Sequence, residues 1–259
     1  MRNSERKYLL LDVGNTHTVL AISDGSKILG RWRISTRRFE TEDEFFTLVH
    51  NFGIDDGIKT VAISSVVPSV DIALERYCKK YLKVAPLWVN AEDYDEIKWN
   101  VNVRPSEIGA DRVANVIAVR ELFSGDIIVV DFGTAITVDV LVGDTYEGGA
   151  ILPGFRTSIM ALFTGTAKLP QVDLKDPGRS LGKDTEDNIQ IGVVRGLVKA
   201  VDSIIDDIEN ETSRKYRIIA TGGNSHLAVG LSKHIKEVDE DLTIKGILIF
   251  AKKRMENLR

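Results

Sequence analysis

The sequence predicts an α/β protein composed of two duplicated halves, and three features support this expectation. An apolar strand followed directly by Asp-x-Gly occurs twice, at residues 8–14 and 126–133. In both copies a turn signal, at residues 24–25 and 143–144, follows the aspartate at the same distance along the chain. The two copies are separated by close to half of the 259 residues. A shared motif, a shared turn spacing and this separation together indicate a duplicated domain.

Each copy is expected to form three antiparallel strands. Apolar and β-branched residues dominate the segments on both sides of each Asp-x-Gly loop, and the turn signal ends the second segment. The expected strands are residues 8–11, 16–22 and 28–34 in the first half and residues 126–130, 135–142 and 146–152 in the second.

The rest of each half alternates between helix and strand. Thr41 and Glu44 form a capping box, which predicts a helix that begins there. Further elements are expected as strands at residues 60–67, 87–89, 217–220 and 244–250, and as helices at residues 69–82, from about 110, 155–163, 185–209 and 225–237. The boundary is expected inside the helix that begins near residue 110, so the predicted halves are residues 1–118 and 119–259.

Composition and charge restrict the class of protein. With 43% hydrophobic and 28% charged residues, the chain is typical of a soluble globular protein. Its net charge of -4 comes from mixed charges without long blocks of one sign, which argues against a nucleic-acid partner. The single cysteine, Cys78, is expected to be a buried thiol in a helix. The polar residues 1–7 and the short apolar run at 8–11 match neither a signal peptide nor a membrane span, so we expect a cytoplasmic protein.

An aspartate at a strand end, followed by a glycine turn and a threonine, suits phosphate and metal binding. The carboxylate can hold Mg²⁺, glycine lets the backbone approach a phosphate, and turn N–H groups and the hydroxyl are donors to anions. A single copy, such as residues 12–16, is also typical of ordinary hairpins. Two copies that face one cleft can bind a polyphosphate from both sides.

A further glycine turn, Thr221-Gly222-Gly223-Asn224, lies between an expected strand and an expected helix. It is either a plain connection or a nucleotide contact made by N–H groups at the N-terminus of the helix. The sequence has no Gly-x-x-x-x-Gly-Lys-Ser/Thr loop and no Gly-x-Gly-x-x-Gly after a strand, which argues against a P-loop or Rossmann enzyme.

These motifs resemble the acetate/sugar kinase, Hsp70 and actin superfamily, and within it the type III pantothenate kinase family over nearly the whole chain. The residues that carry the resemblance are 12–16, 105–112, 131–135, 146–154, 165–170, 182–185 and 221–223. The resemblance implies two ribonuclease H-like (actin-like ATPase) domains with a cleft between them. It also implies a homodimer that uses ATP to phosphorylate pantothenate to 4'-phosphopantothenate, the first step of coenzyme A biosynthesis.

The resemblance further implies roles for individual residues. Asp111 would act as the general base toward the primary hydroxyl of pantothenate, Asp12 would bind Mg²⁺, and Asp131 would bind a monovalent cation, potassium or ammonium. The implied pantothenate contacts are Gly109, Ala110, Asp111 and Arg112, with Thr185 reaching across the dimer interface. The candidate ATP contacts are Asp12, Val13, Gly14, Asn15, Thr16, His17, Thr18, Val19 and Thr134, together with Gly222 and Gly223.

Alternative interpretations are open for several residues. Asp111 opens a helix and could be a first-turn acid that interacts with the helix dipole. Arg112 could be a surface ion-pair partner or a bidentate ligand of a substrate carboxylate. His17 could approach a phosphate or pack against its neighbours. Ile136 stands where the family commonly has threonine, and we expect a local difference in packing there. Arg104 stands where many relatives have asparagine, which bears on the wall of the pantothenate pocket.

The whole protein also has alternative functions from two other classes. One is a kinase of the same superfamily that acts on a sugar or on acetate. The other is an Hsp70-like or regulatory protein, although no appended peptide-binding domain, helix-turn-helix or basic helix is visible in the sequence.

Overall fold

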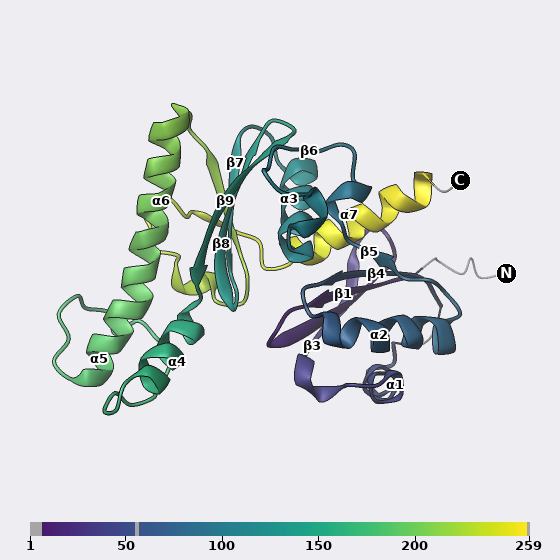
Figure 1. The fold of residues 1–259 in the computed structure, drawn as a ribbon, viewed down its shortest axis with the longest axis horizontal. Coiled ribbons are helices and arrows are strands. Elements are labelled where there is room, and N and C mark those ends of the chain that lie inside the picture. Colours follow the sequence, from purple (N-terminus) through teal and green to yellow (C-terminus); the bar gives the residue numbers. More distant parts are fainter. Residues whose placement is uncertain (1–6, 55–56, 258–259) are drawn as a thin grey trace. The chain divides into compact units, whose positions relative to one another are not determined.

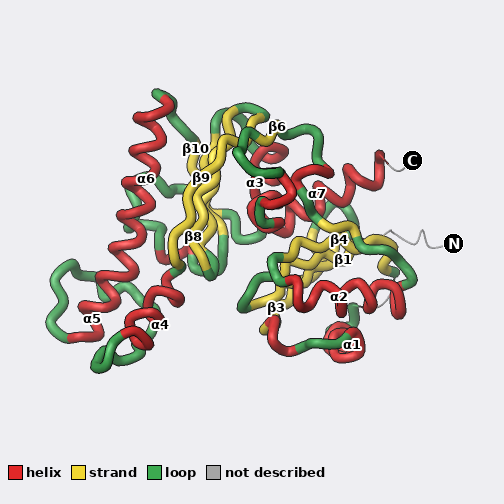
Figure 2. The backbone as a smooth tube through the Cα atoms, viewed as in Figure 1, coloured by secondary structure: helices red, strands yellow, loops and turns green. Residues whose placement is uncertain are grey.

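The computed structural model describes residues 7–54 and 57–257, and the chain divides into two compact units. The first unit contains the chain up to Leu122 together with the segment from Leu242 onward, and the second runs from Phe123 to Asp241. Figure 1 labels most elements of both units, and Figure 2 separates helices, strands and loops by colour. Within the described ranges, no helix is both long and apolar enough to span a membrane.

The first unit is built on a sheet with the strand order β3-β2-β1-β4-β5. Strand β1 is antiparallel to β2, to which a tight hairpin joins it, and parallel to β4, which the chain reaches after β2, β3 and a helix. The strands are β1 (Lys7–Val13), β2 (His17–Ser23), β3 (Ile28–Ser35), β4 (Ile58–Ser65) and β5 (Leu87–Trp88), and β6 (Lys98–Trp99) follows along the chain.

Helices of the first unit pack on this sheet. Alternate residues of β1, Leu9 and Leu11, join a buried core with Phe45 of α1 and Leu74 of α2. Helix α7 packs against α3, β1 and β4. The helices are α1 (Glu42–Asn51), α2 (Pro68–Tyr77), α3 (Ala110–Leu122) and α7 (Leu242–Asn257), with shorter helical turns η1 (Thr36–Arg38), η2 (Cys78–Leu82), η3 (Ala91–Asp93) and η4 (Pro105–Glu107).

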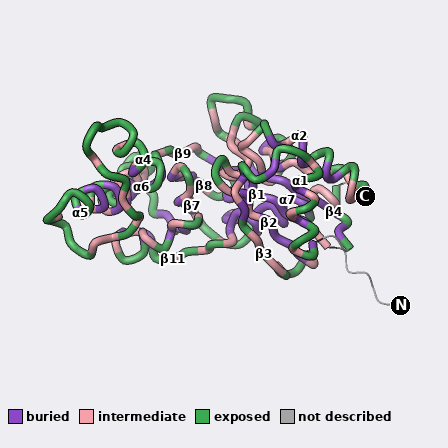
Figure 3. Tube along the Cα trace, turned by 90° about the horizontal axis from the view of Figure 1, so that it is seen from below, coloured by how far each residue is buried: buried purple, intermediate pink, exposed green. Residues whose placement is uncertain are grey.

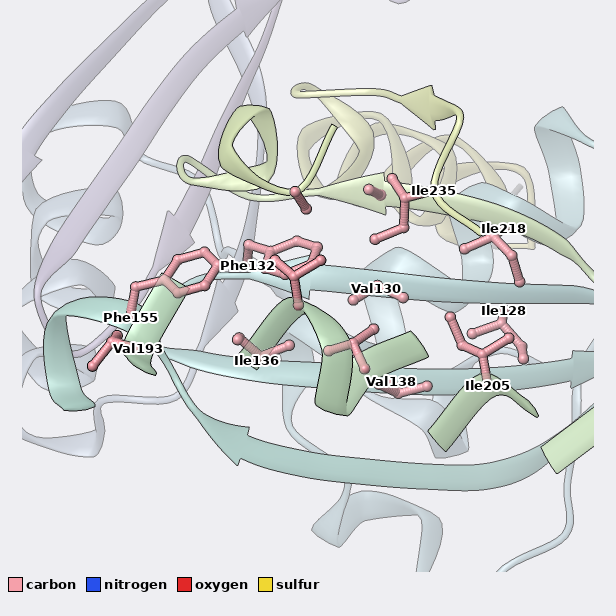
Figure 4. Close-up of a cluster of buried hydrophobic side chains, with 14 of the residues drawn as sticks. Ile128, Val130, Phe132, Ile136, Val138, Phe155, Val193, Ile205, Ile218 and Ile235 are labelled. Atoms are coloured by element: carbon pink, nitrogen blue, oxygen red, sulfur yellow. The ribbon is translucent and has the colours of Figure 1, made fainter. Parts of the chain in front are cut away.

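The second unit contains strands in the order β11-β10-β7-β8-β9. Its core gathers alternate residues of β7 and β8, such as Val130 and Ile136, against Phe155 of α4 and Ile205 of α6 (Figure 4). The strands are β7 (Ile127–Phe132), β8 (Ala135–Val142), β9 (Thr145–Pro153), β10 (Arg217–Thr221) and β11 (Glu237–Val238). The helices are α4 (Phe155–Gly165), α5 (Thr185–Gln190) and α6 (Gly196–Thr212), with shorter turns η5 (Ile191–Arg195) and η6 (Ser225–Leu227).

The two units repeat one arrangement of strands. Each strand of one sheet has a counterpart at the same position in the other, when the order β9-β8-β7-β10-β11 is aligned with β3-β2-β1-β4-β5. In both units the first strand is antiparallel to the second and parallel to the fourth. Buried residues concentrate in the inner strands, β1, β2 and β4 of one unit and β7, β8 and β10 of the other (Figure 3). The predicted α/β class and the predicted duplication are therefore confirmed.

Most predicted elements lie where the sequence placed them. The capping box is confirmed, because the Thr41 side chain accepts from the Glu44 N–H while the Glu44 carboxylate accepts from the Thr41 N–H. The helix predicted over residues 185–209 is present as α5, a π-helical turn and α6 in direct succession. Cys78 is fully buried as expected, and burial raises the pKa of its thiol to about 12, so the reactive thiolate is suppressed at neutral pH.

The strand predicted at residues 244–250 is wrong, because this segment lies in helix α7. From Leu242 to Leu248 every residue except Lys245 is buried, so the segment lacks the polar side that marks a helix in a sequence. The helix also belongs to the first unit. The predicted halves, residues 1–118 and 119–259, are continuous, whereas the first unit takes its last helix from the far end of the chain.

The helix predicted at residues 225–237 is also wrong. The segment forms the short turn η6, a loop and strand β11. The backbone of Gly230 has a φ of 84°, which interrupts any helix. The Asp202 carboxylate of α6 accepts hydrogen bonds from the Ser232 hydroxyl and from the Lys233 N–H at 3.0 Å. These bonds to a distant helix stabilise the loop in place of helical hydrogen bonds.

Candidate active site

Asp12 lies at the carboxyl end of β1, the central strand of the first sheet, just before the hairpin to β2. It is half-buried, and the positions paired with it are Val19 on β2 and Ser64 on β4. The hairpin turn exposes Asn15 and Thr16. The segment predicted to bind phosphate therefore presents exposed polar residues next to a carboxylate.

Backbone and side-chain hydrogen bonds fix this hairpin turn. The Gly14 N–H donates to the His17 carbonyl at 3.0 Å. From the start of η1, which follows β3, the Thr36 hydroxyl donates to the Gly14 carbonyl at 2.6 Å and the Thr36 N–H donates to the Thr16 carbonyl at 3.1 Å. A turn that is held before any ligand arrives loses less conformational entropy on binding.

His17 makes a contact that the sequence analysis did not anticipate. Its Nδ1 lies 3.0 Å from a guanidinium nitrogen of Arg33 on β3. This contact shows that His17 packs against a neighbour, and its approach to a phosphate stays a prediction. Arg33 brings positive charge to the side of the turn, where it would attract a phosphate. The alternation of exposed and less exposed residues along β3, with Arg31 and Arg33 both exposed, is the signal that could have identified it.

Asp111 lies in the first turn of α3, in the half-buried segment 109–112. The Arg112 N–H donates to Asp111 Oδ1 at 2.8 Å, and the Val113 N–H donates to the Gly109 carbonyl at 3.0 Å. A Cβ on Gly109 would lie only 2.7 Å from Asp111 Oδ1, so this position favours glycine. The Asp111 carboxylate is thus held by a backbone N–H in the first turn of its own helix.

The Asp111 segment and the Asp12 turn both lie next to Val66, where the carboxyl ends of β1 and β4 meet one edge of the first sheet. Val66, which follows β4, donates its N–H to the carbonyl of Val13 at 3.1 Å. A Cβ on Gly109 would lie 3.6 Å from Val66 Cγ1, an ordinary van der Waals contact. Within this unit, the structure therefore brings the predicted general base to the same sheet edge as the predicted phosphate-binding turn.

Asp131 repeats the position of Asp12 in the second unit. It is half-buried at the carboxyl end of β7, and its paired positions are Thr137 on β8 and Thr221 on β10. Paired residues of neighbouring strands point to the same face of a sheet. Both threonine hydroxyls are buried, and neither has a hydrogen-bond partner among the residues that the structure describes. Three oxygen-bearing side chains therefore share one face at this strand end.

The turn after Asp131 is closed by a glycine from the end of β9. The Gly154 N–H and the Thr157 hydroxyl donate to the Thr134 carbonyl at 3.0 and 2.7 Å. A Cβ on Gly154 would lie 2.4 Å from the carbonyl oxygens of Gly133 and Thr134, so only glycine fits there. The sequence analysis quoted Gly154 only within a motif, and the structure shows that it holds the exposed Thr134 in place.

The Gly222-Gly223 turn lies beside Asp131. Gly222 has a φ of 89°, and a Cβ there would lie 2.3 Å from Asp131 Oδ1. Asn224 donates to the Phe132 carbonyl through its backbone N–H at 3.3 Å and its side-chain amide at 3.4 Å. The proposed contact through a helix N-terminus is not supported, because the turn continues into the short η6 and not into a helix.

Other residues singled out in the sequence lie on different elements. Thr185 is exposed at the first position of α5, behind the cap Asp184, and belongs to the second unit, unlike the other predicted pantothenate contacts. Ile136 is fully buried in the second core, so its difference from the family pattern is one of packing (Figure 4). Arg104 precedes the turn η4 and pairs with Glu107 at 3.1 Å.

One cluster was not recognised in the sequence, because its members are far apart along the chain. Ligand atoms of Asp206, Glu209 and His234 all lie within 4.8 Å of one another. The ammonium groups of Lys233 and Lys215 contact Asp206 and Glu209, and these contacts hold the pKa of both carboxyls below their usual values. The cluster is therefore an ion-pair network that joins α6 to the segments after it.

Solved structures share the fold of this chain. A protein named as a Baf family transcriptional activator from Campylobacter jejuni aligns with a TM-score of 0.62 at 18% identity, covering 96% of this chain and 99% of its own. A ROK family glucokinase from Streptomyces griseus, in complex with glucose and AMPPNP, aligns with a TM-score of 0.55 at 11% identity, covering 95% and 98%. Together with the repeated sheets, these matches define a protein of the two-domain actin-like ATPase fold.

Sequence comparison defines the family within this class. The model of the type III pantothenate kinase family matches residues 8–207. A type III pantothenate kinase from Thermosipho melanesiensis is 45% identical over 242 residues, covering 93% of this chain and 97% of its own. One from Kosmotoga olearia is 46% identical over 250 residues, covering 95% of both chains.

The chain belongs to the type III pantothenate kinase family. It is a phosphotransferase that uses ATP and phosphorylates pantothenate in coenzyme A biosynthesis. The predicted family, enzyme class and reaction are therefore confirmed.

Proposed function

We propose that this kinase transfers the γ-phosphoryl group of ATP to the primary hydroxyl of pantothenate in the cytoplasm, with Asp111 as the general base. The product is 4'-phosphopantothenate, and the reaction is the first step of coenzyme A biosynthesis. The observation that carries the proposal is the position of Asp111. Its carboxylate is held at the start of α3, at the same sheet edge as the Asp12 turn. A base held in this way can accept the hydroxyl proton while the oxygen attacks phosphorus.

The nucleotide is proposed to contact residues 12–19 together with Thr134, Gly222 and Gly223. Phosphoryl transfer depends mainly on alignment and on neutralisation of charge, which turn amides and exposed hydroxyls can supply. A Mg²⁺ ion on Asp12 would neutralise charge on the phosphate oxygens. The fixed hairpin turn and the exposure of Asn15 and Thr16 support this assignment.

Pantothenate is proposed to contact residues 109–112 and Thr185. Pantothenate carries a carboxylate, and a guanidinium such as that of Arg112 can bind a carboxylate through two parallel hydrogen bonds. Of the two interpretations of Arg112, the proposal adopts the binding of a substrate carboxylate and not the surface ion pair.

Asp131 is proposed to bind a monovalent cation, potassium or ammonium. The buried hydroxyls of Thr137 and Thr221 support this assignment, because they add two neutral oxygens to one carboxylate on a single face. A buried hydroxyl without a partner is unfavourable, so a bound cation would stabilise this arrangement.

We expect the purified protein to convert ATP and pantothenate to 4'-phosphopantothenate in the presence of Mg²⁺, as detected by mass spectrometry. The rate in potassium or ammonium should lie well above the rate in a sodium-only buffer. A phosphorylated sugar in place of 4'-phosphopantothenate would contradict the substrate assignment. Equal rates with all three cations would contradict only the role of Asp131.

The active form is proposed to be a homodimer in which Thr185 completes the pantothenate site of the partner subunit. Thr185 is exposed, and Met160 and Phe163 of α4 in the same unit are 39% and 40% exposed. These two residues are three positions apart on a helix and share a face, and exposed apolar faces are typical of subunit contacts.

Mixing two inactive variants, Asp111→Asn and Thr185→Trp, should restore activity. If Thr185 acts across the interface, each mixed dimer contains one intact site, so about a quarter of wild-type activity is expected after free exchange of subunits. If Thr185 acts within its own subunit, both sites of a mixed dimer carry a substitution and no activity returns. Light scattering on the wild-type enzyme should show a dimer at the assay concentration.

A further inference from the structure

Buried hydroxyls without a partner gather beside the two aspartates. Among the residues that the structure describes, four serine or threonine side chains have a buried hydroxyl without a hydrogen-bond partner, namely Thr60, Ser64, Thr137 and Thr221. Three of these four occupy positions paired with Asp12 or Asp131. An unpaired buried hydroxyl costs about 1–3 kcal/mol. Their concentration at these two positions indicates partners that arrive with a ligand.

Among the described residues, Ser64 carries the buried, unpartnered hydroxyl at a position paired with Asp12. It is fully buried near the end of β4, in parallel register with Asp12 on β1. Neighbouring strands lie about 4.8 Å apart, so a side chain on one can reach the paired side chain on the other directly or through one water. The other position paired with Asp12 is Val19, which has no polar group to offer.

The next residue along the strand shows what a purely structural serine does here. Ser65 points to the opposite face of β4, donates to Asp71 Oδ1 at 2.6 Å and accepts from the Val67 N–H at 3.1 Å. The hydroxyl of Ser65 is therefore used within the fold at the start of α2. The hydroxyl of Ser64 has no such use among the described residues.

We propose that Ser64 is a positioning residue for Asp12, and this rests on the proposed role of Asp12 in binding Mg²⁺. Its hydroxyl donates to the Asp12 carboxylate, or to a water on the metal, and so orients the carboxylate oxygen toward Mg²⁺. Mg²⁺ keeps several of its waters and takes only one or two carboxylates from a protein, so a hydroxyl beside the single carboxylate suits it.

Replacement of Ser64 by alanine is expected to weaken divalent-metal binding. The readout is the Mn²⁺ affinity of the protein with a non-hydrolysable ATP analogue, measured by the EPR signal of free Mn²⁺. The Mg²⁺ concentration that gives half-maximal kinase activity provides a second readout. The dissociation constant for Mn²⁺ and this Mg²⁺ concentration should both rise about tenfold or more, the effect of one lost hydrogen bond to a charged group, while kcat at saturating Mg²⁺ changes less. Ser64→Thr, which keeps the hydroxyl, should stay near the wild-type values.

Thr60→Val is the matched control. Thr60 lies on the same strand and the same face, is buried, and also has a hydroxyl without a partner among the described residues, but its paired position is Tyr8. The Thr60→Val substitution should therefore leave the metal affinity of the protein unchanged. Asp12→Asn tests the underlying assignment, because it should weaken Mn²⁺ binding more than Ser64→Ala does. If Asp12→Asn weakens binding and Ser64→Ala does not, the role of Ser64 is wrong. If neither does, the metal role of Asp12 is wrong as well.

Discussion

Replacement of Asp111 by asparagine is expected to lower kcat by about 10²–10⁴-fold, the usual contribution of a positioned general base. The amide keeps the size and polarity of the side chain but cannot accept the proton of the pantothenate hydroxyl. The nucleotide contacts are proposed on other segments, at residues 12–19 and Thr134, so the affinity for ATP should change little. Steady-state kinetics with a direct measurement of ATP binding would separate the two quantities.

The competing interpretation makes Asp111 a first-turn acid that only stabilises a helix. Asp43 provides the control, because it lies in the first turn of α1 in the same unit. Asp43→Asn should leave kcat unchanged. If Asp111→Asn retains more than about a tenth of the wild-type kcat, the base assignment is contradicted and the helix interpretation is favoured.

The hairpins that carry both aspartates could be predicted from sequence because their signals are local. A strand, a glycine turn and a second strand are specified by neighbouring residues, and the pairing of β1 with β2 and of β7 with β8 follows from the short connection. The crossover to a parallel strand, β4 in one unit and β10 in the other, follows from the duplicated α/β pattern.

What the sequence could not provide depends on contacts between distant segments. Helix α7 was mistaken for a strand because its first part, residues 242–251, is buried and almost entirely apolar, with Gly246 beside the Ala114 carbonyl of α3. The positions of Ser64 and Thr221 beside the aspartates follow from parallel register, which no local pattern specifies. The contact of Arg33 with His17 likewise depends on the pairing of β3 with β2.

Replacement of Gly222 by alanine is expected to lower kcat/KM by about 5- to 150-fold, because the added methyl group collides with Asp131. A Cβ at this position would lie 2.3 Å from Asp131 Oδ1 and 2.7 Å from the Phe132 nitrogen. Such overpacking typically costs about 1–3 kcal/mol, and each 1.4 kcal/mol on the barrier corresponds to about a factor of ten in rate. The carboxylate that is proposed to hold the monovalent cation must move, so a higher potassium concentration should be needed for half-maximal activity.

Gly230→Ala separates this collision from backbone strain. Gly230 has a φ of 84°, close to the 89° of Gly222, but a Cβ there meets nothing within 4 Å. Both alanine variants therefore carry a similar cost for a left-handed backbone, about 1–2 kcal/mol, which thermal unfolding would measure. Only Gly222→Ala should also change activity and the potassium requirement. Equal activities of the two variants would show that the Gly222 turn acts through stability alone, whereas a loss confined to Gly222→Ala would link this turn to the function of Asp131.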